Sequence, residues 1–235
     1  MNVLVTGSSS GIGFGLAKEL CARHFRVAGI SRRASELSAQ FENYRHYQID
    51  LRDFEGLEQA FAPVFEDFDS FDLVILNAGI LGRIAPFHQQ SIEEAREVMT
   101  INVWANKAII DLFIRKKVTV KQWVAISSGA AKNGSAGWGA YSVSKAALNM
   151  LIKTYAAENP ESHFCALAPG LVDTQMQDYI SSLPSRPDMP SIDRLKAAKG
   201  TPDMPDPISA APMLLDAMQK ALEYPGGVFL DVREL

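Results

Sequence analysis

Short runs of apolar residues recur along the chain, and segments with helical periodicity separate them. Most of these runs are continuous rather than alternating, which is typical of strands that are buried on both faces. They predict strands at Val3–Val5, Arg26–Ile30, Tyr44–Ile49, Leu73–Leu76, Trp123–Ile126, Phe164–Leu167 and Val228–Leu230.

Apolar positions four residues apart, such as Leu16 with Leu20 and Leu57 with Phe61, indicate helices between these strands. Ser91 and Glu94 form a Ser-x-x-Glu capping box, which marks a helix start. The predicted helices are Gly13–His24, Phe54–Phe65, Ser91–Phe113, Tyr141–Glu158 and Ile208–Glu223. Repeated alternation of strand and helix predicts an α/β fold: a Rossmann-type doubly wound parallel sheet of about seven strands, with helices on both faces. No internal repeat or linker is visible, so we expect residues 1–235 to form a single domain.

One stretch interrupts this alternation. Seven of the twelve prolines fall between Pro184 and Pro212, with only a short helical candidate, Ile192–Lys199, among them. Proline at this density does not fit inside a sheet, so we expect a surface excursion over about residues 176–207. In an enzyme this segment would be a substrate lid; the alternative is a plain surface loop.

Composition narrows the class of protein. Hydrophobic residues make up 47% and charged residues 21% of the chain, which is ordinary for a globular protein. The net charge of −4, and a longest basic run of only Arg115–Lys117, argue against nucleic-acid binding. The two cysteines, Cys21 and Cys165, are expected to be buried reduced thiols. The chain shows no signal segment and no apolar run of membrane-spanning length, so we expect a cytoplasmic protein without a membrane partner.

The first strand runs into a glycine-rich segment, Thr6-Gly7-Ser8-Ser9-Ser10-Gly11-Ile12-Gly13, which opens the first helix. Glycines allow a sharp turn and a close approach of the backbone to a pyrophosphate, and the helix N-terminus offers free N–H donors. This position after the first strand favours a dinucleotide site over a simple strand-to-helix turn. The expected contacts are Thr6, Gly7, Ser9, Ser10, Gly11, Ile12 and Gly13.

The end of the second strand indicates which nicotinamide nucleotide would bind. An acid there would select NAD(H), but this chain has Ser31-Arg32-Arg33 and no acid before Glu36. Guanidinium groups suit a 2′-phosphate, so NADPH/NADP+ is expected; the alternative is that both arginines are merely exposed. Asp50, followed by Leu51, would accept a hydrogen bond from the adenine amino group or would cap the next helix.

Tyr141 and Lys145 lie four residues apart near the start of a helix, so their side chains meet on one face. A neighbouring ammonium is expected to lower the pKa of the Tyr141 phenol and to suit it to proton transfer. Ser128 stands thirteen residues earlier, at the carboxyl end of the preceding strand. Ligands of open α/β sheets bind at this edge, so the two hydroxyls are expected to converge on one carbonyl oxygen.

Together these motifs resemble the short-chain dehydrogenase/reductase family. They are Thr6-Gly7-x-x-x-Gly11-x-Gly13, Asn77-Ala78-Gly79, Asn102, Ser128, Tyr141-x-x-x-Lys145 and Pro169-Gly170, and the resemblance covers about residues 1–175 and the final strand. The segments Gly137–Tyr141, Ala168–Gln177 and Gly227–Asp231 are similar to the branch that contains sepiapterin reductase and bacterial benzil reductase.

The resemblance implies a role for each matched residue. Tyr141 would be the general acid, Ser128 would polarise the carbonyl, and Lys145 would bind the nicotinamide ribose and tune Tyr141. Asn102 would hold a water molecule that relays protons to Lys145; otherwise it is an ordinary helical asparagine.

Further residues would contact the nucleotide. Asn77-Ala78-Gly79 would line the adenosine ribose, or form a bare strand-to-loop turn. Pro169, Gly170, Val172 and Thr174 would border the nicotinamide. The family also suggests a homodimer through the helices that begin at Ser91 and Tyr141.

The expected substrate pocket is apolar or aromatic, with Leu81, Gly82, Ala130, Trp138, Met176 and Tyr179 around Ser128 and Tyr141. This lining suits a flat or aromatic carbonyl compound. Trp138 has core packing or a dimer contact as its alternative. Asp231 matches a position that anchors the pterin in sepiapterin reductases, although relatives with other substrates also carry an acid there.

Three functions compete at this stage. The first is NADPH-dependent reduction of a vicinal diketone or an aromatic or pterin-like ketone; the second is an NAD-dependent alcohol dehydrogenase; the third is a non-catalytic NADP(H)-sensing protein. The complete Ser128, Tyr141 and Lys145 set favours an enzyme over a sensor. No metal is expected, because the four histidines lack ligand spacing. A serine hydrolase is excluded because Ser128 lacks a G-x-S-x-G elbow.

Overall fold

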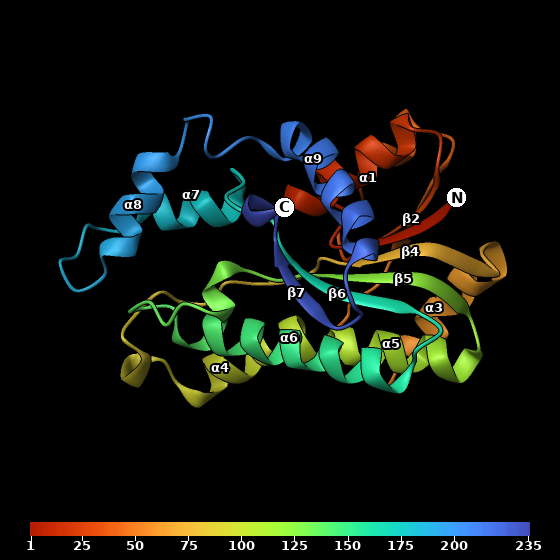
Figure 1. The fold of residues 1–235 in the computed structure, drawn as a ribbon, viewed down its shortest axis with the longest axis horizontal. Coiled ribbons are helices and arrows are strands. Elements are labelled where there is room, and N and C mark those ends of the chain that lie inside the picture. Colours follow the sequence, from red (N-terminus) through yellow and green to blue (C-terminus); the bar gives the residue numbers. More distant parts are fainter.

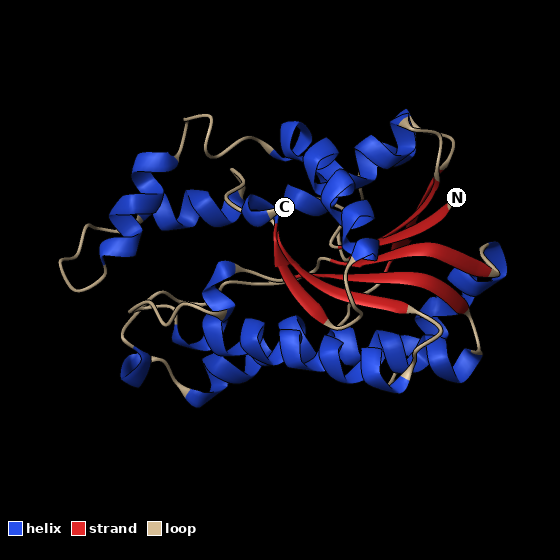
Figure 2. Ribbon diagram, in the orientation of Figure 1, coloured by secondary structure: helices blue, strands red, loops and turns tan.

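The computed structural model describes residues 1–235 and confirms the predicted sheet. Seven parallel strands follow the order β3-β2-β1-β4-β5-β6-β7 (Figures 1 and 2). Their bounds are β1 Asn2–Thr6, β2 Arg26–Ser31, β3 Tyr44–Gln48, β4 Ser70–Leu76, β5 Thr119–Ile126, β6 His163–Ala168 and β7 Val228–Asp231. Each predicted strand is present to within a few residues.

Helices cover both faces of this sheet (Figure 1). One layer contains α1 (Gly11–Ala22) and α9 (Pro207–Lys220), which pack against each other. The opposite layer contains α3 (Leu57–Asp67), α4 (Ile92–Met99), α5 (Ala105–Lys116) and α6 (Gly139–Glu158). A short helix, α2 (Leu37–Gln40), lies between β2 and β3. None of the helices is both long enough and apolar enough to cross a membrane.

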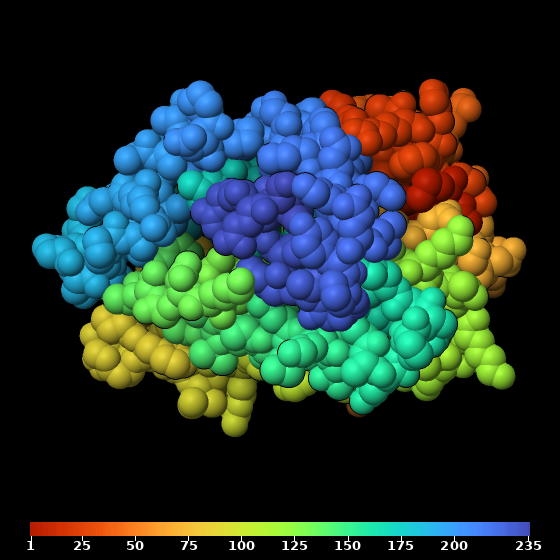
Figure 3. Space-filling model, in the orientation of Figure 1, coloured from red at the N-terminus to blue at the C-terminus, as the bar shows by residue number.

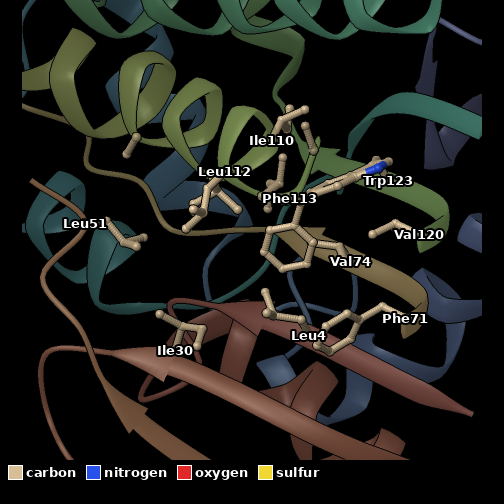
Figure 4. Packing of buried hydrophobic residues seen from close by; sticks show 14 of the residues in the cluster. Leu4, Ile30, Leu51, Phe71, Val74, Ile110, Leu112, Phe113, Val120 and Trp123 are labelled. Carbon is tan, nitrogen blue, oxygen red and sulfur yellow. The ribbon is translucent and has the colours of Figure 1, made fainter. Parts of the chain in front are cut away.

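A separate apolar cluster fills each side of the sheet. The cluster under α3, α5 and α6 includes the residues labelled in Figure 4, where Phe113 packs edge-on against Trp123 with ring centroids 5.3 Å apart. The cluster on the other side joins α1 and α9 to β1 and contains both free cysteines, Cys21 and Cys165. Because both faces are covered, the strands are continuous apolar runs, as the sequence pattern indicates.

The predicted long helix Ser91–Phe113 begins as expected but does not run straight. Ser91 Oγ accepts from the Glu94 N–H at 3.1 Å and Glu94 Oε2 accepts from the Ser91 N–H at 2.7 Å, which completes the capping box. A π-helical turn at Thr100–Trp104 then separates α4 from α5. Such a turn inserts an extra residue and re-aims the side chains that follow, and it places the buried polar Asn102 at the junction.

The proline-rich excursion contains two helices rather than one. The segment after β6 forms α7 (Gln175–Ser182), which the sequence analysis missed. The predicted short helix Ile192–Lys199 corresponds to α8 (Pro190–Ala198), which begins two residues earlier and ends one residue earlier. Pro190 lies in the first turn of α8, where its missing N–H costs nothing. Both helices project at one end of the molecule (Figures 1 and 3).

The strand order places a crevice at the carboxyl edge of the sheet. After β3 the chain crosses back to β4, so β1 and β4 are neighbours and their connections leave in opposite directions. In open α/β sheets this switch point is where ligands bind.

Candidate functional site

A cavity of about 410 Å³ lies at the carboxyl ends of the strands. Its lining includes most of the residues that the sequence analysis placed in the nucleotide site: Gly7, Ser9, Ser10, Gly11, Ile12, Ser31, Arg32, Arg33, Asp50, Leu51, Asn77, Ala78, Gly79, Tyr141, Lys145, Pro169 and Thr174, together with Met176. The lining does not include Thr6, Gly13, Asn102, Ser128, Trp138, Gly170, Val172 or Asp231.

The glycine-rich turn forms one wall of the cavity. Gly7 and Gly11 have φ angles of 71° and 59°, a conformation that side chains disfavour. A Cβ atom on Gly13 would lie 2.4 Å from both the Asn77 Nδ2 and the Gly7 carbonyl oxygen, so only glycine lets α1 pack this closely under the turn. No side chain caps the N-terminus of α1. The first backbone N–H groups of this helix therefore lie at the cavity wall without a hydrogen-bond acceptor in the helix.

Thr6 supports this wall from behind. Its buried hydroxyl accepts from the backbone N–H groups of Asn77 at 2.9 Å and Ala78 at 3.0 Å. In return the Asn77 Nδ2 donates to the Thr6 carbonyl at 2.9 Å. Thr6 and Gly13 therefore position the turn and do not themselves line the cavity.

Three arginines, Arg32, Arg33 and Arg52, line the cavity beside the glycine-rich turn. The Arg33 Nη2 donates to Ser10 Oγ at 3.1 Å and so bridges the second strand end to the glycine-rich turn. Arg52, which the sequence analysis did not single out, also lines the cavity and pairs with Asp50 at 2.6 Å. Hydrogen bonds from Arg52 hold the pKa of Asp50 below its ordinary value. Asp50 does not cap the next helix, because the N-cap of α3 is Gly56.

Tyr141 and Lys145 meet on one face of α6, as their spacing predicts. Both are buried, and the Lys145 Nζ lies 5.7 Å from the centre of the Tyr141 ring. The ammonium donates to the Ile126 carbonyl at 2.7 Å, which ties α6 to the end of β5. Ser128 caps the short turn after β5, accepting from the Ala130 N–H at 3.1 Å, and its hydroxyl lies against the Tyr141 phenol.

Burial governs the protonation of this pair. It raises the pKa of Tyr141, and the hydrogen bond from Ser128 opposes the rise. It also lowers the pKa of Lys145 to about 8. The expectation that the pKa of Tyr141 is lowered is therefore wrong in this structure, because burial is the largest influence on the phenol and raises its pKa.

The Asn102 side chain makes three hydrogen bonds within the protein. Its Oδ1 accepts from the Ile80 N–H at 2.8 Å, and its Nδ2 donates to the Ile80 carbonyl and to Ser144 Oγ, each at 2.9 Å. These bonds join the loop after β4 to α6 one residue before Lys145. Both Nδ2 hydrogens are engaged, whereas Oδ1 keeps a second lone pair, so the role of Asn102 in holding a relay water stays a prediction.

Apolar residues cover Tyr141 on the side of α7 and α8. Tyr141 and Trp138 belong to a buried cluster with Leu81, Ile180 and Met189, and Ala130 and Met176 pack against it. The Trp138 Nε1 donates to Ser191 Oγ at 2.8 Å, which fixes α8 over this cluster.

Two further pocket candidates lie at its edge. The Tyr179 hydroxyl accepts from the Ile84 N–H at 3.4 Å, and Gly82 has a φ of 73° close to Val98.

Three candidates lie behind the cavity wall or beside it. Val172 is buried in the cluster with α9, and Gly170, with a φ of 71°, packs against the side chains of Val232 and Arg233. Asp231 is buried at the end of β7, and both of its oxygens accept from the Arg233 guanidinium, at 2.8 and 2.6 Å. Hydrogen bonds from Arg233 hold the pKa of Asp231 below its ordinary value. Asp231, which the sequence analysis expects to bind substrate, is thus paired with Arg233 within the chain.

Comparisons with known proteins identify the family of the chain. Residues 1–184 match the family described as short chain dehydrogenase. The chain is 31% identical to benzil reductase ((S)-benzoin forming) of Bacillus cereus, over 99% of each chain, and 30% identical to the NADPH-dependent pterin aldehyde reductase of Arabidopsis thaliana, over 74% of this chain and 76% of that protein. The crystal structure of the KRED1-Pglu enzyme superposes with a TM-score of 0.85 at 23% identity, covering 97% of this chain and 99% of that one.

Proposed function

The chain belongs to the short chain dehydrogenase family, and from this premise we propose that it is an NADPH-dependent carbonyl reductase. The observation that carries the proposal is that Tyr141 and Lys145 line the same cavity as the glycine-rich turn, with the Ser128 hydroxyl beside the Tyr141 phenol. The apolar and aromatic surroundings of Tyr141 favour a vicinal diketone or an aromatic carbonyl compound as substrate. Similarity to the Bacillus cereus benzil reductase supports the same substrate class.

The residues present fit a nicotinamide dinucleotide phosphate. The pyrophosphate would lie on the uncapped N-terminus of α1, where side chains on Gly7 or Gly13 would collide with Asn77 and its neighbours. Arg32 and Arg33 would hold a 2′-phosphate by charge-assisted hydrogen bonds. When bound, the nicotinamide supplies the hydride that reduces the carbonyl carbon.

The chain itself supplies orientation and a proton. The Ser128 hydroxyl would donate a hydrogen bond to the substrate carbonyl oxygen and fix it beside the Tyr141 phenol. Because burial keeps the phenol protonated, Tyr141 would donate its proton to that oxygen as negative charge develops. The Lys145 ammonium, held by the Ile126 carbonyl, would then stabilise the phenolate until a proton returns.

The apolar cluster around Trp138 would exclude water from this reaction. In this proposal α7 and α8, within the excursion at 176–207, form the substrate lid. Met176 of α7 and Trp138, which binds Ser191 of α8, pack in the cluster that contains Tyr141. Asp231 would act on substrate only through Arg233, because its own oxygens are occupied.

The functional unit would be a homodimer. α5 and α6 lie side by side, joined by the hydrogen bond from Tyr155 to Asp111. Large apolar side chains are exposed on α6, at Val143 and Met150, and in the turn before α5, at Trp104. A second copy of these helices would cover these side chains.

The direct test is NADPH oxidation, followed by absorbance, with benzil, a phenyl-substituted diketone, sepiapterin and a simple ketone. We expect turnover on the diketones, faster with NADPH than with NADH. Arg32→Ala should weaken NADPH binding and leave NADH binding unchanged. Equal use of NADH, with activity only toward alcohol oxidation, would instead support an NAD-dependent alcohol dehydrogenase; binding of NADPH without turnover of any carbonyl would support a sensor.

A further inference from the structure

A buried hydroxyl cluster lies under the glycine-rich turn and has no part in the proposed chemistry. The Tyr44 hydroxyl, on β3, is 2.9 Å from Ser8 Oγ within the turn, and both side chains are buried. Tyr44 reaches Ser8 by crossing β2 at Gly29, where a Cβ atom would lie 1.9 Å from the Tyr44 oxygen. A glycine in the middle of a strand weakens it, so its presence here marks a close approach that the fold requires.

The same hydroxyl contacts two other segments. It lies 3.4 Å from the His46 Nδ1, and the buried Ser35 side chain is near enough to affect the pKa of the phenol. Ser35 ends the segment that carries Arg32 and Arg33 after β2. One phenol thus binds the floor of the glycine-rich turn and lies beside the base of the arginine segment.

A second bridge joins the same two segments at the surface. There the Arg33 guanidinium donates to Ser10 Oγ in the turn. Ser31 Oγ donates to the Arg33 carbonyl at 2.7 Å, which holds the backbone of the arginine segment beside this bridge. The turn and the arginine segment therefore approach each other at two places. One is at the surface, at Arg33 and Ser10, and the other is in the core, at Tyr44.

We propose that Tyr44 is a positioning residue for NADPH: its hydroxyl, through Ser8 and Ser35, sets the spacing between the glycine-rich turn and the arginine segment. This inference rests on the proposed function, because it assumes that the pyrophosphate lies on the turn and the 2′-phosphate on the arginines. Ser8 and Tyr44 are buried and do not line the cavity, so neither would contact a phosphate itself.

The test is Tyr44→Phe, which keeps the ring and removes the hydroxyl. Buried Ser8 and Ser35 then lose a shared partner, so we expect NADPH to bind about 3- to 10-fold more weakly, the range of one lost hydrogen bond. NADH, which has no 2′-phosphate and uses only the turn, should lose less. The kcat at saturating NADPH should stay near that of the wild type, because Tyr141, Lys145 and Ser128 are untouched.

Tyr47→Phe is the matched control, since Tyr47 lies on the same strand and donates to the exposed Asp67. It should leave both dissociation constants unchanged. Ser8→Ala removes the other end of the 2.9 Å contact and serves if Tyr44→Phe folds poorly. Both substitutions break the same hydrogen bond, between Ser8 and Tyr44. The double variant should therefore bind NADPH about as weakly as whichever single variant has the lower affinity.

The results separate the two proposals. Wild-type protein that binds neither nucleotide would overturn the proposed function, and this inference with it. Tight NADPH binding by wild type with unchanged binding by Tyr44→Phe and Ser8→Ala would overturn the inference alone. Equal weakening of NADPH and NADH would also overturn it, because the hydroxyl would then not act on the arginine segment.

Discussion

The Lys145 ammonium has one acceptor in the protein, the Ile126 carbonyl, and otherwise lies among buried groups. Removal from water favours its neutral form and lowers its pKa to about 8. In the unfolded chain the pKa of a lysine is about 10.4. Between these values the unfolded state binds more protons than the folded state, so the free energy of unfolding rises with pH.

This predicts a pH-dependent stability difference between the wild type and Lys145→Met. As pH rises from 8 to 10, the difference should shift by about 2 kcal/mol in favour of the wild type, because the cost of its buried charge disappears. Urea unfolding at both pH values measures it. Lys153→Met, at an exposed position of the same helix, should show no such shift. A constant difference for Lys145→Met would mean that its pKa is ordinary.

At the scale of single residues, the sequence predicts which side chains meet but not their pKa values. The i, i+4 spacing of Tyr141 and Lys145 suffices to place them together. The pKa of Tyr141 depends on burial by Leu81, Met189 and other residues far along the chain, which no local pattern reveals. The hydrogen bonds of Asn102 were not predicted for the same reason, since its partners Ile80 and Ser144 are distant in sequence.

The junction of β1 and α1 is tightly packed at Gly13. Gly13→Ala would place a Cβ atom 2.4 Å from the Gly7 carbonyl oxygen, so the turn must shift. We expect the free energy of unfolding to fall by about 1–3 kcal/mol and NADPH affinity to fall at least about tenfold. Gly134→Ala, where nothing lies within 4 Å, is the control and should change neither. Calorimetry and nucleotide titration measure the two effects; normal affinity in Gly13→Ala would contradict this packing argument.

The lid proposal makes a prediction about α8. Ser191→Ala removes the hydrogen bond from Trp138, so amide exchange in Pro190–Ala198 should accelerate and KM for the carbonyl should rise about 2- to 10-fold. The Kd for NADPH should not change. Ser185→Ala, which removes an exposed contact with Asp193 in the same excursion, should leave KM unaltered. An unchanged KM in Ser191→Ala would show that α8 does not cover the substrate.

Element boundaries were predictable where local signals exist. The capping box at Ser91 and the apolar runs of the strands are such signals. No local signal marks the π-helical turn at Thr100–Trp104, because this turn depends on the tertiary contacts of Asn102. α7 was missed because Gln175–Ser182 has few apolar residues, and its burial depends mainly on Ile180 packing against α8.

For the whole molecule, alternating strands and helices predict the parallel sheet and its two helical layers, since crossovers are right-handed and cover both faces. Association between copies leaves no such pattern. From the exposed Trp104, Val143 and Met150 we expect sedimentation at twice the chain mass of 25.7 kDa. Met150→Glu should shift the protein toward monomer, whereas Met213→Glu, on the opposite layer, should not. A wild-type monomer at micromolar concentration would contradict the dimer proposal.

The central claim is that Tyr141 gives its proton to a carbonyl while NADPH is oxidised. The most direct measurement is the rate of benzil reduction by Tyr141→Phe at saturating NADPH, alongside its Kd for NADPH and with Tyr155→Phe, farther along α6, as the control. The account predicts a rate at least about 100-fold below that of the wild type, with the Kd within about twofold, because the general acid alone is lost. Near wild-type reduction by Tyr141→Phe would contradict it.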